Sequence, residues 1–458
     1  MTLELPKQVK QIIHTLQERG YEAYAVGGCV RDAMLGREPQ DWDITTSALP
    51  MQVKALFRRT IDTGIQHGTV TVLLDRVGYE VTTYRVDGEY KDGRHPTEVS
   101  FTASLAEDLK RRDFTINAMA YNETEGLVDL FCGSEDLKQG VIRCVGAPRE
   151  RFSEDALRIL RAFRFSAQLD FAIEEETLRA AGELAETLKK ISAERIYTEL
   201  TKLLISEHPE RLLEAYDCGI TKIILPEFDA MCETAQNHPA HFTDVGRHCL
   251  KTTEVIGKTS VFDGRKIGET EYRYLRFAAL FHDVGKPDSR TTDAEGIDHF
   301  RGHAESGAEL VKKIMRRLKA DNATIDTVSR LVRWHDYPFV PEERPVRRAM
   351  NKMGADLVPL LLELRYADLQ AHAEPYRTNG CEGLHQVWKA YEEIRKKGEC
   401  TSLKELAING SDLIAAGFAP GKELGETLGL LLDLVIEDPG KNVKEVLLQA
   451  ALSEKKMQ

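Results

Sequence analysis

Two neighbouring stretches decide the fold of the N-terminal region: Tyr24-Ala-Val-Gly-Gly-Cys-Val-Arg-Asp-Ala-Met-Leu-Gly36 and Asp41-Trp-Asp-Ile-Thr-Thr46. The pair Gly27-Gly28 ends an apolar, strand-like run and precedes a segment carrying Arg31, which predicts a strand followed directly by a helix. Glycine lets backbone N–H groups approach a phosphate, and the first turn of a helix favours anions. We therefore expect this junction to bind phosphate.

The second stretch places two acidic residues, Asp41 and Asp43, two positions apart. On a strand, residues i and i+2 share a face, so both carboxylates would point the same way. Such a pair suits Mg²⁺ that also holds substrate phosphates, and two such ions activate an attacking hydroxyl and steady a leaving pyrophosphate. Glu80, on a following hairpin, is a candidate third catalytic acid. The alternative is that Asp41 and Asp43 lie in a solvated loop and that Glu80 is an exposed glutamate of a strand.

The surrounding patterns mix helix and strand. Apolar residues at helical spacing predict a helix over Lys7–Arg19. The β-rich runs Thr69–Leu74 and Tyr79–Tyr84, separated by Asp75–Gly78, predict a hairpin, and the polar run Glu89–Pro96 predicts a mobile loop. We therefore expect an α+β fold, in which a head with a small mixed or antiparallel sheet precedes an all-α remainder.

The remainder of the chain has helical patterns. Helices are expected at Ser153–Gln168, Glu174–Lys189 and Ala193–Ile205, and a helical tail is broken at Gly417–Gly421. We expect four domains: a head at 1–138, a helical neck at 139–231, a histidine-rich domain at 232–378 and a tail at 379–458.

The expected helix Ser153–Gln168 carries regularly spaced charges. Arg158, Arg161 and Arg164 fall away from its apolar stripe, and Asp155 lies next to Arg158. An adjacent carboxylate and guanidinium offer acceptors and donors to the edge of a base, and neighbouring arginines hold phosphates. The alternative is a salt bridge on a solvated helix.

The overall composition is acidic, with 62 Lys and Arg against 74 Asp and Glu and a net charge of −12. This balance excludes a uniformly basic nucleic-acid coat, yet positive charge gathers in 143–164 and in Lys110-Arg111-Arg112. The N-terminus shows no signal peptide, and no apolar run is long enough to span a bilayer. No two of the eight cysteines are close enough to form a Cys-x-x-Cys pair, so we expect reduced thiols and a cytoplasmic protein.

At this point the sequence resembles the bacterial class II tRNA nucleotidyltransferases, the CCA-adding enzymes that share a head domain with bacterial poly(A) polymerases. The resemblance covers residues 20–205 through the motifs Gly27-Gly28…Arg31-Asp32…Asp41-x-Asp43, Lys110-Arg-Arg-Asp-Phe-Thr-Ile-Asn-Ala-Met119, Asp129-Leu-Phe-Cys-Gly133 with Asp136-Leu137, Glu154-Asp155-x-x-Arg158-x-x-Arg161-x-x-Arg164, and Ala193-Glu-Arg-Ile196. It continues more weakly in Leu406–Val435, where Asn409-Gly410-x-Asp412 and Gly417-x-x-Pro-Gly421 look like the family's tRNA-binding tail.

This resemblance implies a role for each matching residue. Asp41 and Asp43 would hold the catalytic Mg²⁺. The triphosphate of the nucleotide would contact Gly28, Arg31 and Arg112. Asp155 and Arg158 would pair with the edges of CTP and then ATP, in a pocket that Arg161 and Arg164 support. The tRNA 3′-hydroxyl would attack the α-phosphate in line, while the protein positions the groups and neutralises charge.

The histidine-rich zone resembles a second family, the HD phosphohydrolases. In that superfamily a divalent metal is bound by four residues, which match His248, His282, Asp283 and Asp368 here; His303 and His335 match the ligands of a second metal. Imidazoles and carboxylates suit Mn, Ni, Fe or Mg that activates water. The resemblance implies hydrolysis of phosphomonoesters or 2′,3′-cyclic phosphates. The alternative is a degenerate HD fold that acts as a helical spacer.

The expected function is the addition and repair of the 3′-terminal CCA of tRNA from CTP and ATP with release of pyrophosphate, without a membrane partner. The stretch Asp87–Phe101 looks like the complete flexible loop that CC-adding relatives lack. The open alternatives are an A-adding tRNA nucleotidyltransferase, a poly(A) polymerase, an HD phosphohydrolase with an RNA-binding head, and a noncatalytic RNA-binding protein. Whether the chain dimerises is not readable from the sequence.

Overall fold

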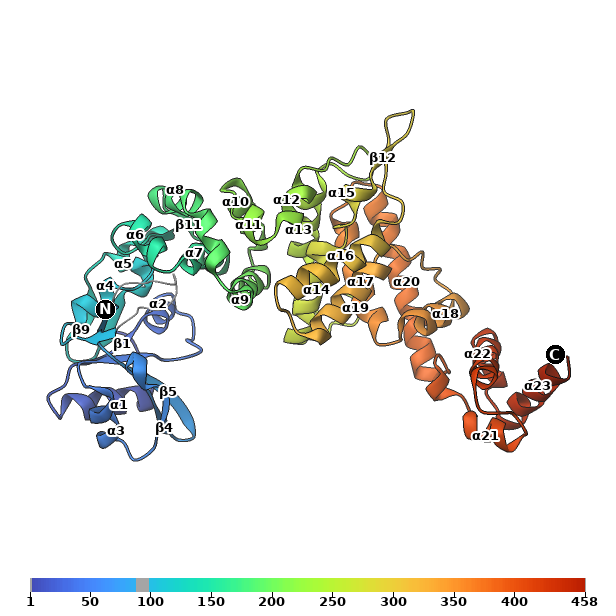
Figure 1. Ribbon diagram of the computed structural model, residues 1–458, viewed down its shortest axis with the longest axis horizontal. Helices are drawn as coiled ribbons and strands as arrows, with labels where there is room; N and C mark the ends of the chain where they lie inside the picture. The colour runs from blue at the N-terminus through green and yellow to red at the C-terminus, as the bar shows by residue number, and fades with distance from the viewer. Residues whose placement is uncertain (1, 88–98, 458) are drawn as a thin grey trace. The chain divides into compact units, whose positions relative to one another are not determined.

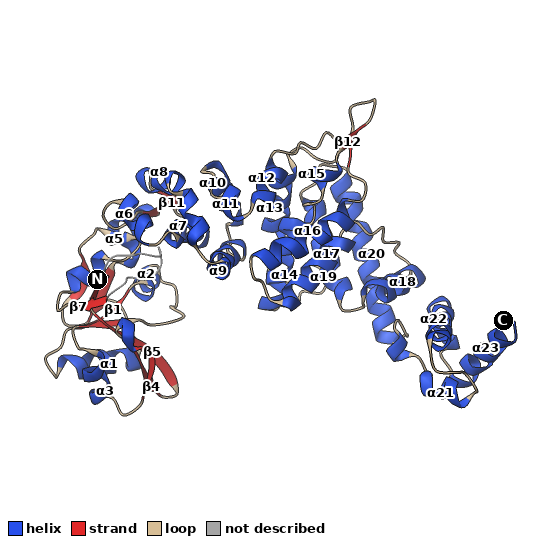
Figure 2. Cartoon of the chain, in the orientation of Figure 1, coloured by secondary structure: helices blue, strands red, loops and turns tan. Residues whose placement is uncertain are grey.

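The computed structural model describes residues 2–87 and 99–457. The chain forms two compact units, Met1–Pro226 and Glu227–Gln458 (Figure 1). Strands gather in the first unit, whereas the second is almost entirely helical (Figure 2). This confirms the expected α+β fold with a small mixed sheet in the head. The finer division into four domains stays a prediction, and its last boundary, between 378 and 379, falls inside helix α20 (Tyr376–Lys397).

The first unit is built on one seven-stranded sheet with the order β3-β4-β5-β2-β1-β8-β9. Only β2 and β5 pair in parallel among these neighbours; the other pairs are antiparallel. The strands are β1 (Ala23–Val26), β2 (Ile44–Thr46), β3 (Thr60–Gly64), β4 (Thr69–Leu74), β5 (Val77–Thr83), β8 (Met119–Asn122) and β9 (Gly126–Asp129). The expected hairpin is confirmed as β4 and β5, joined through Asp75 and Arg76 at positive φ.

Helices of the first unit pack against this sheet and continue beyond it. The helix expected at the N-terminus is confirmed as α1, whose four regularly spaced apolar residues are all buried. The helices are α1 (Lys7–Gln17), α2 (Gly28–Met34), α3 (Pro50–Leu56), α4 (Leu105–Lys110), α5 (Gly133–Gln139), α6 (Pro148–Glu154), α7 (Leu157–Leu169), α8 (Glu175–Glu183), α9 (Ala193–Leu204), α10 (Leu212–Asp217) and α11 (Thr221–Ile224).

Two short strand pairs accompany them. One pair, β10 (Val141–Ile142) and β11 (Ala172–Ile173), is parallel and lies in the region expected to be helical only. The other, β6 (Arg85–Asp87) and β7 (Val99–Phe101), flanks the stretch expected to be a flexible loop. The loop prediction for Glu89–Pro96 lies outside the described residues.

The prediction of one continuous helix over Ser153–Gln168 is wrong. Helix α6 ends at Glu154, Asp155 adopts an extended conformation with φ −138° and ψ 103°, and α7 begins at Leu157. Asp155 therefore lies in the break between two helices and not on the face of one. Its side chain caps the new helix by accepting a hydrogen bond from the backbone N–H of Leu157 at 3.0 Å.

The second unit is a helical body that continues into a tail with its own core. Its helices are α12 (Pro226–Cys232), α13 (Val245–Val255), α14 (Glu269–Phe281), α15 (Lys286–Ser289), α16 (His303–Arg317), α17 (Asn322–Trp334), α18 (Glu343–Met353), α19 (Leu357–Gln370), α20, α21 (Gly410–Ala415), α22 (Lys422–Glu437) and α23 (Lys444–Met457). A small hairpin pairs β12 (Thr291–Thr292) with β13 (Asp298–His299). The break at Gly417–Gly421 is confirmed between α21 and α22, around a buried cluster that includes Leu413, Phe418 and Leu432.

All eight cysteines are free thiols, as their spacing predicts. Within 2–87 and 99–457, no helix combines the length and apolar character needed to cross a membrane.

Candidate active site and candidate metal centre

The glycine junction forms as the sequence predicts, with β1 ending at Val26 and α2 beginning at Gly28. Gly27 has φ +84°, and a Cβ atom there would lie 2.9 Å from Nη1 of Arg112. A side chain at this position would be strained and would displace the guanidinium, so only glycine allows this approach. The structure thus brings Arg112, predicted to contact the triphosphate, beside the strand–helix junction.

Arg31 is buried and held in one orientation. It donates to Oδ1 of Asp32 at 2.9 Å and to Oδ1 of Asn117 at 2.6 Å. Its guanidinium also lies 5.1 Å from the centre of the Phe165 ring. The side chain of Arg31 is therefore fixed by contacts from α2, from the second motif and from α7.

The acidic pair lies just before β2, because that strand begins at Ile44. The prediction that Asp41 and Asp43 belong to a strand is therefore wrong. The parallel register still aligns the acids, since Ile44 pairs with Val81 and the residues immediately before them are Asp43 and Glu80. Asp41, Asp43 and Glu80 are all exposed.

The pKa values of these acids indicate that they influence one another. Partial loss of solvation raises the pKa of Asp43, the Arg112 charge opposes this rise and the Asp41 charge adds to it. Partial burial, followed by the charges of Asp43 and Asp41, raises the pKa of Glu80. Among the described residues, the three acids do not form a group with all ligand oxygens within 4.8 Å, so the arrangement is open.

The arginines of α7 face acidic partners, with Arg158 and Arg164 buried and Arg161 partly exposed, which differs from a solvated helix face. Arg161 pairs with Asp113 at 2.6 Å and Arg164 with Glu199 at 3.0 Å. Burial alone would raise the pKa of Asp113, but Arg161 and the hydrogen bond from Asn117 hold it at about 2. Asp113 and Asn117 thus connect Arg161 to Arg31.

The expected pair of Asp155 and Arg158 has a different arrangement. Asp155 accepts from Nη2 of Arg195 on α9 at 2.7 Å, and Arg158 forms an ion pair with Glu154. Arg158 also donates to the backbone carbonyl of Arg111 at 2.9 Å. The Arg195 contact places the motif Ala193-Glu-Arg-Ile196 against the break between α6 and α7.

The third motif has a structural role. Asp129 accepts backbone hydrogen bonds from Gly133 and Ser134, each at 2.8 Å, at the start of α5. Asp136 accepts from Thr115 at 2.6 Å and from Arg143. These bonds hold the loop that follows β9.

Several supporting residues were not predicted individually, although they lie in quoted motifs or on the predicted helices. Asp113 and Asn117 belong to the second motif, and Glu154 and Arg195 belong to the fourth and fifth. The aromatic residue that faces Arg31, Arg161 and Arg164, Phe165, follows the fourth motif directly, and Glu199 lies on the helix expected at Ala193–Ile205.

The six predicted ligands of the second unit converge on one point. The two oxygens of Asp283 face different imidazoles: Oδ2 lies 3.2 Å from Nε2 of His282, and Oδ1 lies 3.3 Å from His303 and 3.5 Å from His335. His248 completes the first side, with Nε2 at 4.0 Å from Oδ2.

Asp368 closes this group. Its Oδ1 lies 2.9 Å from Nε2 of His248 and 3.5 Å from Nε2 of His282. These residues come from α13, the end of α14 and α19, and all three are buried. Among the described residues, Nε2 of His282 is buried and has no well-aligned hydrogen bond, although carboxylate oxygens of Asp283 and Asp368 lie 3.2 Å and 3.5 Å away. A buried nitrogen directed at two carboxylates is what a metal ligand requires.

Neighbouring charges in this group shift the pKa values of its members strongly. Burial would raise the pKa of Asp283, but His282 and Lys286 hold it well below its usual range. Burial would lower the pKa of His282, yet Asp283 holds it well above its ordinary value. Lys286 lies 2.7 Å from Oδ2 of Asp283. The group opens into a cavity of about 560 Å³, whose lining includes Lys286, Arg333 and Arg365.

The fold and these sites define the class of protein. A mixed sheet with a strand–Gly-Gly–helix junction and aligned acids is a nucleotidyltransferase head, and residues 23–143 match the family model of the poly A polymerase head domain. Residues 170–232 match the probable RNA and SrmB-binding site of polymerase A. Residues 302–451 match the putative domain 2 of tRNA nucleotidyltransferases.

Relatives identify the family within this class. The CCA-adding enzyme of Enterococcus faecalis is 36% identical over 447 residues, covering 97% of this chain and 95% of that one. The CCA-adding enzyme of Lactobacillus helveticus is 36% identical over 432 residues, covering 94% and 93%. The chain belongs to the family of CCA-adding enzymes and is an enzyme of the tRNA nucleotidyltransferase class.

Solved structures agree over the whole length. The structure of the Bacillus stearothermophilus CCA-adding enzyme in complex with CTP has a TM-score of 0.71 and 28% identity, covering 99% of both chains. The Thermotoga maritima CCA-adding enzyme complexed with tRNA has a TM-score of 0.58 at 21% identity, covering 98% of this chain and 94% of that one, and supports the fold.

Proposed function

We propose that this enzyme adds and repairs the 3′-terminal CCA of tRNA, using CTP and ATP as substrates and releasing pyrophosphate. The observation that carries this proposal is a continuous chain of contacts across the first unit. Arg31 binds Asn117, Asn117 binds Asp113, and Asp113 binds Arg161 on α7. The phosphate-binding junction is thereby joined to the helix that would read the base.

The roles of the head residues follow from their positions. Gly28, Arg31 and Arg112 bind the triphosphate, because the glycines admit it and the guanidiniums carry the opposing charge. Asp41 and Asp43 are the ligands of the catalytic metal, and Glu80 is the third acid beside them. The attack of the tRNA 3′-hydroxyl on the α-phosphate is promoted mainly by positioning and charge neutralisation.

The metal that fits the head is Mg²⁺. The donors are carboxylate oxygens, which Mg²⁺ prefers, and their openness leaves coordination positions for phosphates. When bound, the ion supplies Lewis-acid stabilisation of charge on the transferring phosphoryl group. The charge of Arg112 opposes the rise in the pKa of Asp43, so Arg112 is close enough to share in neutralising the triphosphate.

Base selection belongs to Asp155 and Arg158, supported by Arg161 and Arg164. The extended backbone at Asp155 directs its carboxylate to Arg195, which fixes the carboxylate's orientation. A carboxylate and a guanidinium held by other residues offer a rigid acceptor and donor to a base edge. Protein side chains would then act in place of a nucleic-acid template.

Three tRNA transcripts test this function: one lacking CCA, one ending in CC and one ending in CCA, each with labelled CTP or ATP. We expect C and then A on the first, A alone on the second and nothing on the third. Incorporation of A only on the CC-ended transcript would favour the A-adding alternative, and long A tails on all three would favour a poly(A) polymerase.

The second unit supports an additional activity, metal-dependent hydrolysis of phosphomonoesters or 2′,3′-cyclic phosphates. The specific observation in its favour is Asp283, whose two oxygens face different imidazoles, as a carboxylate that bridges two ions does. Borderline transition metals such as Mn, Ni or Fe suit this mixed set of donors, and Mg is the hard-ion alternative. The bound metal supplies activated water, while Lys286 and Arg365 provide positive charge for a phosphate.

Hydrolysis of a chromogenic phosphodiester and of 2′,3′-cyclic AMP, measured after chelation and again after adding each metal, tests this activity. Turnover that disappears with the metal and returns with it is expected. Metal-independent turnover would contradict the proposed mechanism, and no turnover with any metal would leave the second unit as a helical spacer. The eight free thiols fit a reducing compartment, and the compartment we propose is the cytoplasm.

A further inference from the structure

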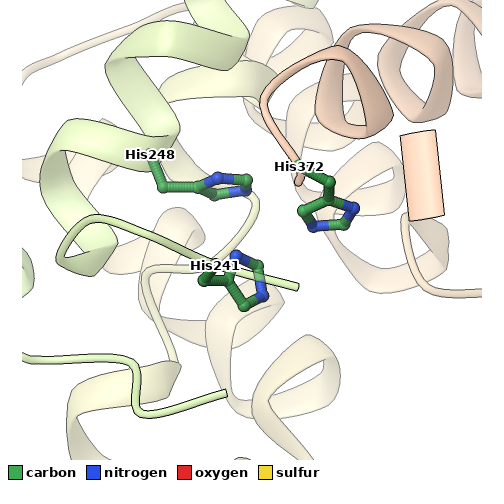
Figure 3. Close-up of side chains that lie close together, drawn as sticks. All are labelled: His241, His248 and His372. Atoms are coloured by element: carbon green, nitrogen blue, oxygen red, sulfur yellow. The ribbon is translucent and has the colours of Figure 1, made fainter. Parts of the chain in front are cut away.

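The six predicted ligands of the second unit, called the paired centre from here on, are His248, His282, Asp283, His303, His335 and Asp368. Two histidines outside this set lie against it. His241 and His372 come from segments far apart in the sequence, the connection before α13 and the residue after the C-cap of α19. With His248 they form a group in which one ring nitrogen from each residue lies within 4.8 Å of the others. Figure 3 shows the three rings around a common space.

The backbone holds this group together. The N–H of Ala373 donates to the carbonyl of Ala240 at 2.9 Å, so the residues directly beside His372 and His241 are hydrogen-bonded to each other. The ring centres of His241 and His372 are 4.6 Å apart, and those of His241 and His248 are 4.8 Å apart. The proximity of these rings thus follows from main-chain pairing and from α13.

One ring nitrogen in this group lacks a partner. Among the residues that the structure describes, Nδ1 of His241 is buried and makes no hydrogen bond. Buried polar atoms in folded proteins nearly always have a hydrogen-bond partner, so such an atom in a cluster of ligands calls for an explanation. A coordinated ion supplies one.

We propose that His241, His248 and His372 form a further transition-metal site, adjacent to the paired centre and sharing His248 with it. Three imidazoles suit borderline ions such as Zn²⁺, Co²⁺, Ni²⁺ or Cu²⁺ and disfavour Mg²⁺, which prefers oxygen. Zn–N distances of about 2.0–2.1 Å place the nitrogens of a tetrahedral site about 3.3 Å apart, so the rings close by at most about 1.5 Å on binding. Water takes the fourth position.

Sharing His248 has a direct consequence. Its Nε2 lies 2.9 Å from Asp368, on the side of the paired centre. A ring nitrogen donates one lone pair and so binds one ion at a time through that atom. When Nε2 of His248 binds an ion together with His241 and His372, the paired centre keeps only His282, Asp283 and Asp368 on that side. Metal binding at that side of the paired centre is then weaker.

Counting bound Co²⁺ on the full, tag-free chain tests the site, using equilibrium dialysis together with visible absorption. We expect the double variant His241→Gln/His372→Gln to bind one Co²⁺ fewer than wild type, and the control His14→Gln, an exposed histidine on α1, to match wild type. Equal counts for wild type and the double variant would overturn the proposal.

Two further variants keep this result interpretable. The single variants His241→Gln and His372→Gln each replace one partly exposed ring. Each is expected to lower the affinity for the Co²⁺ that the double variant loses by about tenfold or more. Unchanged affinity in both would count against the site. Asp283→Asn removes the carboxylate that would bind both ions of the paired centre, and Asp283 is not one of the three histidine ligands, so this variant reports on the paired centre alone. If Asp283→Asn binds as much Co²⁺ as wild type, the proposed hydrolase centre is contradicted. The comparison of wild type with His241→Gln/His372→Gln still tests the three-histidine site.

Discussion

The acidic site of the head and the histidine–aspartate centre of the second unit differ in how closely their ligands are already grouped. Asp41, Asp43 and Glu80 are exposed and form no tight ligand group, whereas His248, His282, Asp283, Asp368 and His335 are buried around shared carboxylates. An open set of oxygens leaves room for the phosphates of a substrate to complete the coordination. A closed set of imidazoles and carboxylates binds its ions as part of the fold. From this difference we expect the head to bind Mg²⁺ together with its substrate and the second unit to bind metal without one.

The largest expected effect is on the open site. Asp41→Ala or Asp43→Ala should lower nucleotide addition by about a thousandfold or more, because the metal that neutralises the phosphates loses a ligand. The control is Asp62→Ala, which removes an exposed acid on β3 paired with Lys54. Labelled-nucleotide incorporation measures the effect. Normal addition in either active-site variant would break the assignment.

A similar loss of metal-dependent hydrolysis is expected when ligands of the second unit are replaced. His282→Ala or Asp283→Ala should remove metal-dependent hydrolysis while leaving CCA addition within about twofold, because neither residue belongs to the head. Both activities are measured on the same preparation. Collapse of addition in these variants would show that the histidine cluster supports tRNA binding instead.

The comparison also predicts where metal affects stability. At a free concentration of about 100 times the dissociation constant, an ion that binds only the folded state adds about 2.7 kcal/mol. Adding Mn²⁺ or Ni²⁺ to the chelated enzyme should therefore slow hydrogen exchange in α14 and α19 and leave β1 and β2 unchanged without nucleotide. Equal protection in both regions would contradict the distinction.

The ion pair between buried Asp113 and partly exposed Arg161 predicts a dependence of stability on pH. Because the pKa of Asp113 is lowered to about 2 from an ordinary value of about 3.9, its stabilisation is complete above pH 4 and is lost as the pH falls towards 2. Asp113→Asn should cost about 2 kcal/mol at pH 7, measured by hydrogen exchange in α7, and less at pH 3. If the loss of stability caused by Asp113→Asn became larger at lower pH, the ion pair would not be its cause.

The smallest effect is expected in base selection. Arg195→Ala removes the partner that orients Asp155, so the ratio of correct to incorrect nucleotide incorporation should fall by about tenfold, equivalent to about 1.4 kcal/mol. Competition between CTP and ATP on the tRNA lacking CCA measures that ratio. The control Arg179→Ala removes an exposed arginine on α8. A proportional loss of all incorporation, with the ratio unchanged, would show that Arg195 only stabilises the fold.

Sequence reasoning succeeded where local patterns act alone and failed where distant segments meet. Helix α1, the hairpin of β4 and β5 and the strand–Gly-Gly–helix junction follow from periodicity and turn residues. The break at Asp155 did not follow, because the apolar spacing continues across it. What favours the break is the ion pair with Arg195, forty positions away, together with the cap on Leu157.

The candidate sites show the same division. The ligand types at the paired centre are readable from His-Asp motifs, yet His241 and His372 carry no motif and meet where Ala240 pairs with Ala373. Similarly, the register of β2 against β5, and not the spacing of the aspartates, aligns Asp43 with Glu80.

The sequence by itself thus determined the fold class, the family resemblance and the chemical character of each site, because these depend on residue type and short-range order. Only the tertiary structure decided which charges are buried together, which oxygen of Asp283 faces which imidazole, and that Asp113 and Asn117 connect Arg161 to Arg31. Those features depend on contacts between segments that are remote in the chain, and short-range order does not specify such contacts.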